Sequence, residues 1–154
     1  MLPATATRVE EHTAEHINEQ IRRQTEENIS RTAAAGPAAI ERRLAELDQE
    51  WDMERTLQTN FATVVLAGIG LGALVDRRWY LLPAVASGFM IQHALQGWCP
   101  PVEVFRRLGF RTAAEIDHER YALKALRGDF RGVPEAGPAS RSGSGKSALE
   151  AAAR

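Results

Sequence analysis

The chain has 154 residues, of which 44% are hydrophobic and 25% are charged, and its formal net charge is −1. This length allows one domain with a modest core. The charge is uneven, because residues 1–56 carry 7 Arg against 12 Asp and Glu, whereas the remainder carries 12 basic against 8 acidic residues. Nucleic acid binds through clustered cations, so the acidic front half argues against nucleic acid as the main partner. A single cysteine excludes an internal disulfide.

Residues 1–56 are predicted to form an acidic helical extension in the cytoplasm. Strand signals are absent, so an all-α protein is expected. Residues 8–35 predict one long polar helix that ends at Gly36-Pro37, and a second helix starts at Pro37. These helices either pack locally or bind a partner protein or a second copy of the chain through residues 8–56. The apolar positions are Val9, Ile17, Ile21 and Ile29 in the first helix and Ile40, Leu44, Leu47 and Trp51 in the second.

Two charge-free segments follow, and they predict an integral membrane hairpin over residues 57–98. Residues 57–75 hold nineteen residues without a charge, and residues 79–98 hold twenty if His93 is neutral. At about 1.5 Å per residue, each covers close to the roughly 30 Å of a bilayer's hydrocarbon core. The alternative is a soluble helical hairpin, but soluble helices normally keep a polar face. The lipid bilayer is therefore the first expected partner.

Small residues in both segments predict how the two spans pack. Gly68 and Gly72 lie four residues apart in the first span, and Ala84 and Gly88 lie four apart in the second. Such spacing lets helix backbones approach closely, which favours association when lipid is as apolar as leucine. We therefore expect these four positions to face one another.

Aromatic and basic residues predict the membrane boundaries and the orientation. Trp79, Tyr80 and Trp98 stand at the ends of the second span, where interfacial aromatics belong. The linker carries Arg77 and Arg78, against six arginines in the flanks on the other side, which favours both termini in the cytoplasm. The six are Arg42, Arg43, Arg55, Arg106, Arg107 and Arg111.

Residues 99–131 predict interfacial and cytoplasmic helices, and residues 132–154 a disordered tail. Pro100-Pro101 should end the second span, because proline disfavours helical geometry at the residue before it. Val102, Phe105 and Leu108 would then lie at the acyl boundary while Arg106 and Arg107 meet headgroups. Thr112 to Glu115 forms a capping box that opens a further helix. The tail is rich in Pro, Gly, Ser and Ala.

Two sequence motifs resemble catalytic or ligand-binding signatures but lack their context. Residues 140–147 (SRSGSGKS) nearly spell a phosphate-binding loop, yet Ser140 replaces the required glycine and no strand precedes it. Residues 12–16 (HTAEH) match an inverted zinc-protease motif, but a third ligand and a protease-sized domain are missing. We therefore expect no nucleotide, no metal and no other cofactor.

Cys99 with His93 is the one candidate for chemistry. They lie six residues apart near the cytoplasmic interface. A thiol at a helix end can be activated, carry sulfur or ligate a metal. The other interpretation is that Cys99 is a small apolar residue at a turn and that His93 is interhelical glue.

Residues 52–111 resemble the YgaP-like inner-membrane domain family, a bacterial family mostly of unknown function. The residues that carry the resemblance are two short spans, the second ending in Gly97-Trp98-Cys99-Pro100, followed by Leu108-Gly109. The resemblance implies a two-span hairpin in the inner membrane. Some relatives add a sulfur-transferring rhodanese domain, whose active cysteine lies outside the hairpin and which this chain lacks.

Two functional hypotheses follow. In the first, the protein is a non-enzymatic membrane anchor or scaffold whose cytoplasmic helices recruit a partner. In the second, Cys99 is a working thiol in sulfur or redox handling at the inner membrane. The sequence favours the first.

Overall fold

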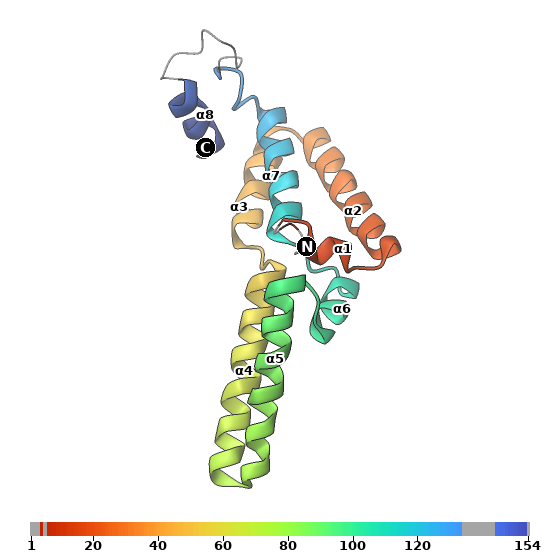
Figure 1. Ribbon diagram of the computed structural model, residues 1–154. Coiled ribbons are helices and arrows are strands. Elements are labelled where there is room, and N and C mark those ends of the chain that lie inside the picture. Colours follow the sequence, from red (N-terminus) through yellow and green to blue (C-terminus); the bar gives the residue numbers. More distant parts are fainter. Residues whose placement is uncertain (1–3, 5, 134–143, 154) are drawn as a thin grey trace. The chain divides into compact units, whose positions relative to one another are not determined.

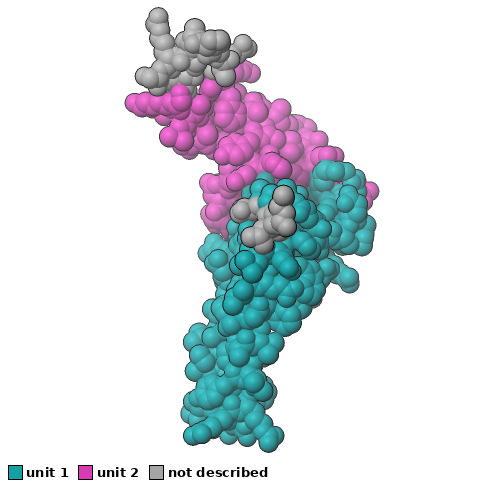
Figure 2. Space-filling view, in the orientation of Figure 1, with its two compact units in different colours: residues 1–22, 51–114 teal, residues 23–50, 115–154 magenta. Residues whose placement is uncertain are grey.

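The computed structural model describes residue 4 and residues 6–133 and 144–153, and within these residues it contains helices and no strand. Figure 1 shows the helices in chain order. They form two compact units, one of residues 1–22 and 51–114 and the other of residues 23–50 and 115–154 (Figure 2). The elements are α1 (Arg8–Glu11), α2 (Glu15–Ala34), α3 (Pro37–Gln49), α4 (Met53–Leu74), the 3-10 helix η1 (Arg77–Tyr80), α5 (Leu81–Gln96), α6 (Pro100–Arg107), α7 (Ala113–Arg127) and α8 (Ser144–Ala153).

The long first helix expected over residues 8–35 is broken into α1 and α2. Side chains at the break bind carbonyls of the first helical turn: the Thr13 hydroxyl donates to the Val9 carbonyl at 2.7 Å, and the Asn18 amide donates to the Glu10 carbonyl at 3.0 Å. Short polar side chains of this kind compete with helical backbone bonds. Residues 12–14 are therefore a corner, and the expectation of one uninterrupted helix was wrong.

Helices α4 and α5 form an antiparallel hairpin, with η1 at its tip (Figure 1). The Asp52 carboxylate caps α4 by accepting from the Arg55 backbone N–H at 2.8 Å. At the tip, the Asp76 carboxylate accepts from the Arg78 N–H at 2.8 Å and so shapes the turn. Among the described residues, one helical stretch, the one that ends at Leu74, is long and apolar enough to cross a membrane, and 17% of its most apolar window is buried within the protein.

The glycines of α4 pack against α5, but their contacts differ from those expected. Gly68 is buried against the ring of Pro83, and a Cβ on Gly72 would lie 2.7 Å from the ring of Tyr80. Ala84 and Gly88 are exposed, and a Cβ on Gly88 would meet nothing within 4 Å. The rings of Tyr80 and Pro83, near the start of α5, therefore occupy the space beside the two glycines that Ala84 and Gly88 were expected to occupy.

Helix α5 ends at Gly97, before the prolines that were expected to end it. Gly97 has a φ of +83°, and its N–H bonds the His93 carbonyl at 2.7 Å, which closes the helix in a left-handed cap. A Cβ on Gly97 would also collide with the backbone of Arg8. Pro100 and Pro101 instead open α6, where the missing N–H groups cost nothing.

Helix α6 packs on protein with the face that was expected to lie on lipid. Val102 is 1% exposed, and Phe105 packs on the same cluster, whereas Leu108 is exposed. Arg106 was expected at the headgroups but is 1% exposed, because its guanidinium donates to Asn18 Oδ1 at 2.8 Å and to the Phe110 carbonyl at 3.2 Å. Arg107 is exposed.

The second unit has its own apolar core and an ion-paired side chain within it. The seam of α3 packs against α7 rather than being left for a partner, with Ile29 of α2 beside it. Glu119 is fully buried, and its Oε1 accepts a hydrogen bond from Nε of Arg43 at 2.7 Å. This hydrogen bond raises the pKa of Arg43 above its usual value. The buried members of the core are Ile40, Leu44, Leu47, Ile116 and Leu123.

Part of the expected disordered tail is helical. Residues 144–153 form α8, a run of good helix formers, and Lys124 donates from Nζ to the Ala152 carbonyl at 2.6 Å. Residues 134–143 and 154 lie outside the described residues. The phosphate-loop motif is thus described only from Ser144 onward, where the backbone enters α8.

Candidate functional site

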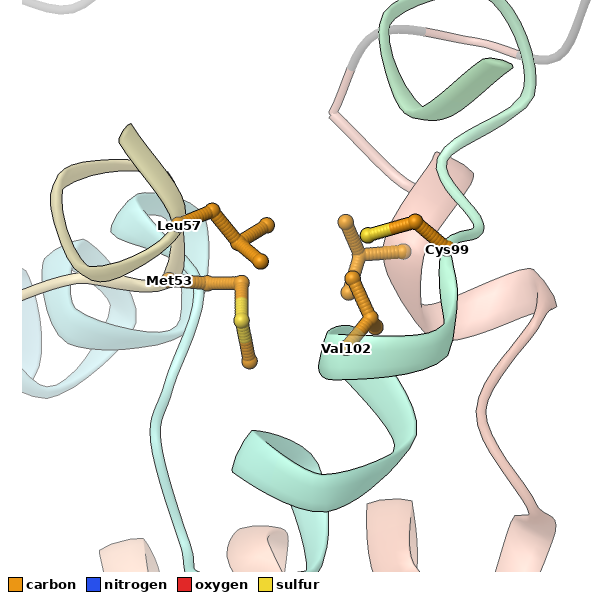
Figure 3. Close-up of a cluster of buried hydrophobic side chains, with 5 residues drawn as sticks. Met53, Leu57, Cys99 and Val102 are labelled. Atoms are coloured by element: carbon orange, nitrogen blue, oxygen red, sulfur yellow. The ribbon is translucent and has the colours of Figure 1, made fainter. Parts of the chain in front are cut away.

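The candidate site lies where the two long helices of the first unit meet α1 and α6. A cluster of five buried apolar residues forms the packing there: Val9, Met53, Leu57, Cys99 and Val102. Figure 3 shows the sulfur of Cys99 pointing toward Leu57. Cys99 itself is the extended residue that precedes α6, and it is 4% exposed.

Glu54 and His93 form the polar half of the site. Glu54 is in the first turn of α4, and His93 is in the last turn of α5, so the antiparallel hairpin brings them together. Nε2 of His93 lies 3.3 Å from each carboxylate oxygen of Glu54. Arg8 completes the group, with Nη2 at 2.7 Å from Glu54 Oε1.

The charges of this group support one another. The hydrogen bond from His93 lowers the pKa of the Glu54 carboxyl below its ordinary value, and Arg8 adds to this effect against the opposing desolvation. Glu54 lies ahead of the charge-free segment that starts at Leu57, and its side chain is 37% exposed. An ionised Glu54 can therefore stabilise a positive charge on His93.

The other ring nitrogen of His93 faces no conventional acceptor or donor. His93 is 1% exposed, and within the described residues its Nδ1 is buried without a hydrogen-bond partner. Cys99 follows the same end of α5, as the residue that precedes α6. The Glu54 contact therefore fixes the ring of His93 through Nε2 alone.

Cys99 also lines an apolar groove between α4 and α5. The groove has a volume of about 280 Å³, and Cys99, Pro100 and Pro101 are among the residues that line it. Its walls come from facing turns of the hairpin, including Val64 and Phe89. Asn60 is the one lining residue whose side chain carries N–H donors. Cys99 thus borders an apolar space on one side and the buried apolar cluster on the other.

The remaining predicted site residues lie at the two ends of the hairpin. Arg77, Arg78, Trp79 and Tyr80 make up η1 and are exposed at its tip. Trp98 is half-buried at the other end. His12, from the apparent zinc motif, has its Nδ1 2.9 Å from the Arg8 carbonyl. No group of three His, Cys, Asp or Glu side chains in the described part of the chain could hold a metal ion.

The sequence reasoning found Cys99 and His93 but missed Glu54 and Arg8. Glu54 looked like one more acid of the polar extension. A signal was nevertheless present: Glu54 begins α4 a few residues ahead of the first apolar segment, and His93 stands a few residues before the second one ends. An antiparallel pairing places such positions at the same level.

Comparisons of the chain with protein-family models, with curated proteins and with solved structures find no match.

Proposed function

We propose that this chain is a small bacterial inner-membrane protein that acts as a non-enzymatic anchor, with a two-span hairpin in the bilayer and helical parts in the cytoplasm. The observation that carries the proposal is the surface of α4 and α5. Large hydrophobic side chains are exposed on both helices, and a water-facing hairpin would be driven to aggregate by so much apolar surface. The exposed residues include Leu66, Ile69, Leu74, Leu81, Val85, Ile91 and Leu95.

The ends of the hairpin support the same proposal. Aromatic and basic side chains gather in η1, as they do at a membrane boundary. The ion-paired Arg8 and Glu54 and the buried Arg106 lie at the opposite end, beside the polar helices α1 and α6. Helix α5 has 16 residues, and η1 extends it at the tip, so the second span is short and suits a thin or locally thinned bilayer.

Alkaline carbonate extraction of cell membranes tests the anchor directly. The full chain should stay in the membrane pellet, because two spans bury more apolar surface than an interfacial helix does. Reporter fusions at each terminus should both read as cytoplasmic, given the excess of arginines on that side. Release of the protein by carbonate, or a reporter active on the outer side, would refute the anchor or its orientation respectively.

A second candidate function is the membrane-bound thiol. The contact of His93 with Glu54 and the burial of Cys99 just after the same end of α5 favour it. Cys99→Ser separates the two functions: an anchor keeps its level and its phenotype with serine, whereas a working thiol loses its function in a correctly inserted protein.

A further inference from the structure

We infer that a polar cleft between α2 and α3 is a binding site for a phosphate group, either inorganic phosphate or a phosphate monoester. The cleft has a volume of about 210 Å³, and all of its lining residues belong to the second unit. The inference therefore does not depend on the hairpin or on the proposed anchor. The polar residues that line the cleft are Asn28, Arg31, Thr32, Arg42, Arg43 and Glu46.

The residue spacing explains why polar side chains meet in this cleft. Asn28, Arg31 and Thr32 are three and four residues apart in α2, so their side chains share one face of that helix. A short turn joins α2 to α3, and Ala35 and Ala39 line the cleft on either side of that turn. Alanine side chains are too short to reach across the cleft, which leaves its space open to a ligand.

Arg43 is the one guanidinium of the cleft that already has carboxylate partners. Its Nε lies 2.7 Å from Glu119 Oε1, and its Nη1 lies 3.1 Å from Glu46 Oε2. Its Nη2 lies 3.8 Å from Glu50 Oε2. Glu46 is the only carboxylate among the described residues that line the cleft. These three carboxylates are therefore engaged by Arg43.

The other two guanidinium groups of the cleft have no carboxylate partner in the described part of the chain. Arg31 donates to Asn28 Oδ1 at 2.7 Å, and Arg42 makes neither a hydrogen bond nor an ion pair with any described residue. Gln24 also donates to Asn28 Oδ1, at 3.1 Å, which leaves the N–H groups of the Asn28 amide for a ligand. Two cations that line one cleft repel each other, and an anion between them is attracted by both.

The donors of the cleft suit a phosphate better than a carboxylate. Each arginine presents its N–H groups as a planar fork that can bond two oxygens of one anion. A carboxylate offers two oxygens in one plane, whereas a phosphate monoester offers three and carries a charge of about −1.5 to −2 at pH 7. A phosphate can thus accept from Arg31 on one helix, from Arg42 on the other and from the Thr32 hydroxyl. The volume is several times the roughly 30 Å³ that one water occupies in the liquid, so a phosphate has room.

The test titrates the full chain in detergent with inorganic phosphate and with glycerol phosphate, by calorimetry at constant ionic strength. We expect saturable binding of one phosphate per chain and no comparable binding of acetate. Arg31→Gln and Arg42→Gln should each weaken the affinity by about tenfold or more, because each removes a charge-assisted hydrogen bond. Both side chains are exposed, so thermal unfolding without phosphate should stay as in the wild type.

Two further variants make the test specific to the cleft. Arg23→Gln removes the same charge from an exposed position of α2 that does not line the cleft, and it should leave the affinity unchanged. Glu46→Gln removes the carboxylate of the cleft, and it should tighten phosphate binding by about twofold or more because a like charge is lost.

Reconstitution into vesicles separates a soluble ligand from a lipid headgroup. Phosphatidic acid carries a phosphate monoester, and phosphatidylglycerol, a diester, serves as the control at equal vesicle charge. A weaker titration with inorganic phosphate in the phosphatidic acid vesicles identifies a headgroup in the cleft, and an equal titration identifies a soluble phosphate; either result supports the site. No saturable phosphate binding, equal binding of acetate, or an equal loss of affinity in Arg23→Gln and Arg42→Gln would each overturn the inference. Carbonate extraction remains the separate test of the anchor.

Discussion

The hairpin of α4 and α5 and the core of the second unit are both helical, but they place their apolar side chains in opposite ways. In the second unit, Leu47 and Leu123 are 1% and 0% exposed and polar residues cover the outside. In the hairpin, Leu66 is 71% exposed and Gly68 is the buried residue of the same turn. The first pattern is that of a protein that folds in water. The second is the pattern expected of the proposed membrane hairpin, whose helices would pack through small residues while large ones face lipid.

Removing a buried leucine of the second unit should have the largest effect on stability. Leu123→Ala leaves a cavity in a packed core and should destabilise that unit by about 2–5 kcal/mol. Leu66→Ala, the matched change in the hairpin, should alter stability by less than about 0.5 kcal/mol. Hydrogen exchange in α3 and α7 of the full chain reports the first change. Faster exchange there in Leu66→Ala, at the level seen for Leu123→Ala, would contradict the comparison.

An introduced aspartate should have the opposite ranking of effects: it should be costly in the hairpin and almost neutral on the surface of the second unit. In the proposed membrane hairpin, Leu66→Asp places a charge near the middle of the first span and should cost about 2.5–3.5 kcal/mol of insertion. Leu126→Asp, at a 54% exposed position in α7, should cost almost nothing because water solvates it. The fraction of each variant that resists carbonate extraction measures the difference. Equal membrane retention of the two variants would show that Leu66 does not face lipid.

Two glycines of the hairpin provide the third contrast. A Cβ on Gly68 would collide with the Pro83 ring, so Gly68→Ala should force the helices apart and cost about 1–3 kcal/mol. Gly88→Ala has open space around it and should be neutral or slightly stabilising, because alanine favours a helix. Thermal unfolding in detergent, monitored by the protease resistance of the hairpin, compares the two variants. A destabilised Gly88→Ala would contradict the open space found around Gly88.

Local sequence patterns predicted the helices well, because each depends on neighbours in the chain. The spacing of Ile40, Leu44 and Leu47 correctly predicted the buried face of α3, and the charge-free segments predicted α4 and α5. Trp51, the fourth position of that expected face, lies beyond the end of α3 and is exposed. These patterns report which side of a helix avoids water. They cannot tell lipid from a partner surface, and they do not show which residues cover the face.

The failures occurred where a side chain has a distant partner. Arg106 looked like a headgroup ligand, but its partner Asn18 is 88 residues away in sequence. Gly97, at the end of α5, lies against the backbone of Arg8 in α1. The residues around Gly97 in the sequence give no sign of this contact. The Glu54 and His93 contact depends in the same way on the register of α4 and α5, which the glycines and Pro83 set.

The smallest expected effect concerns acid, and it compares Glu54 with another carboxylate of the same unit. Its lowered pKa means that the folded state binds the proton less well than the unfolded state does. The stabilisation is therefore present above the ordinary pKa of 4.5 and is lost as the pH falls through the lowered value. The carboxylate is 37% exposed, so solvent screening keeps the effect small.

Hydrogen exchange of α1 should quicken as the pH falls below about 4.5, after correction for intrinsic rates. Glu54→Gln should remove that acid-dependent step, whereas Glu103→Gln in α6 should retain it, since Glu103 lies outside the contact of Glu54 with Arg8 and His93. An unchanged acid response in Glu54→Gln would show that the carboxylate does not hold α1 against the hairpin.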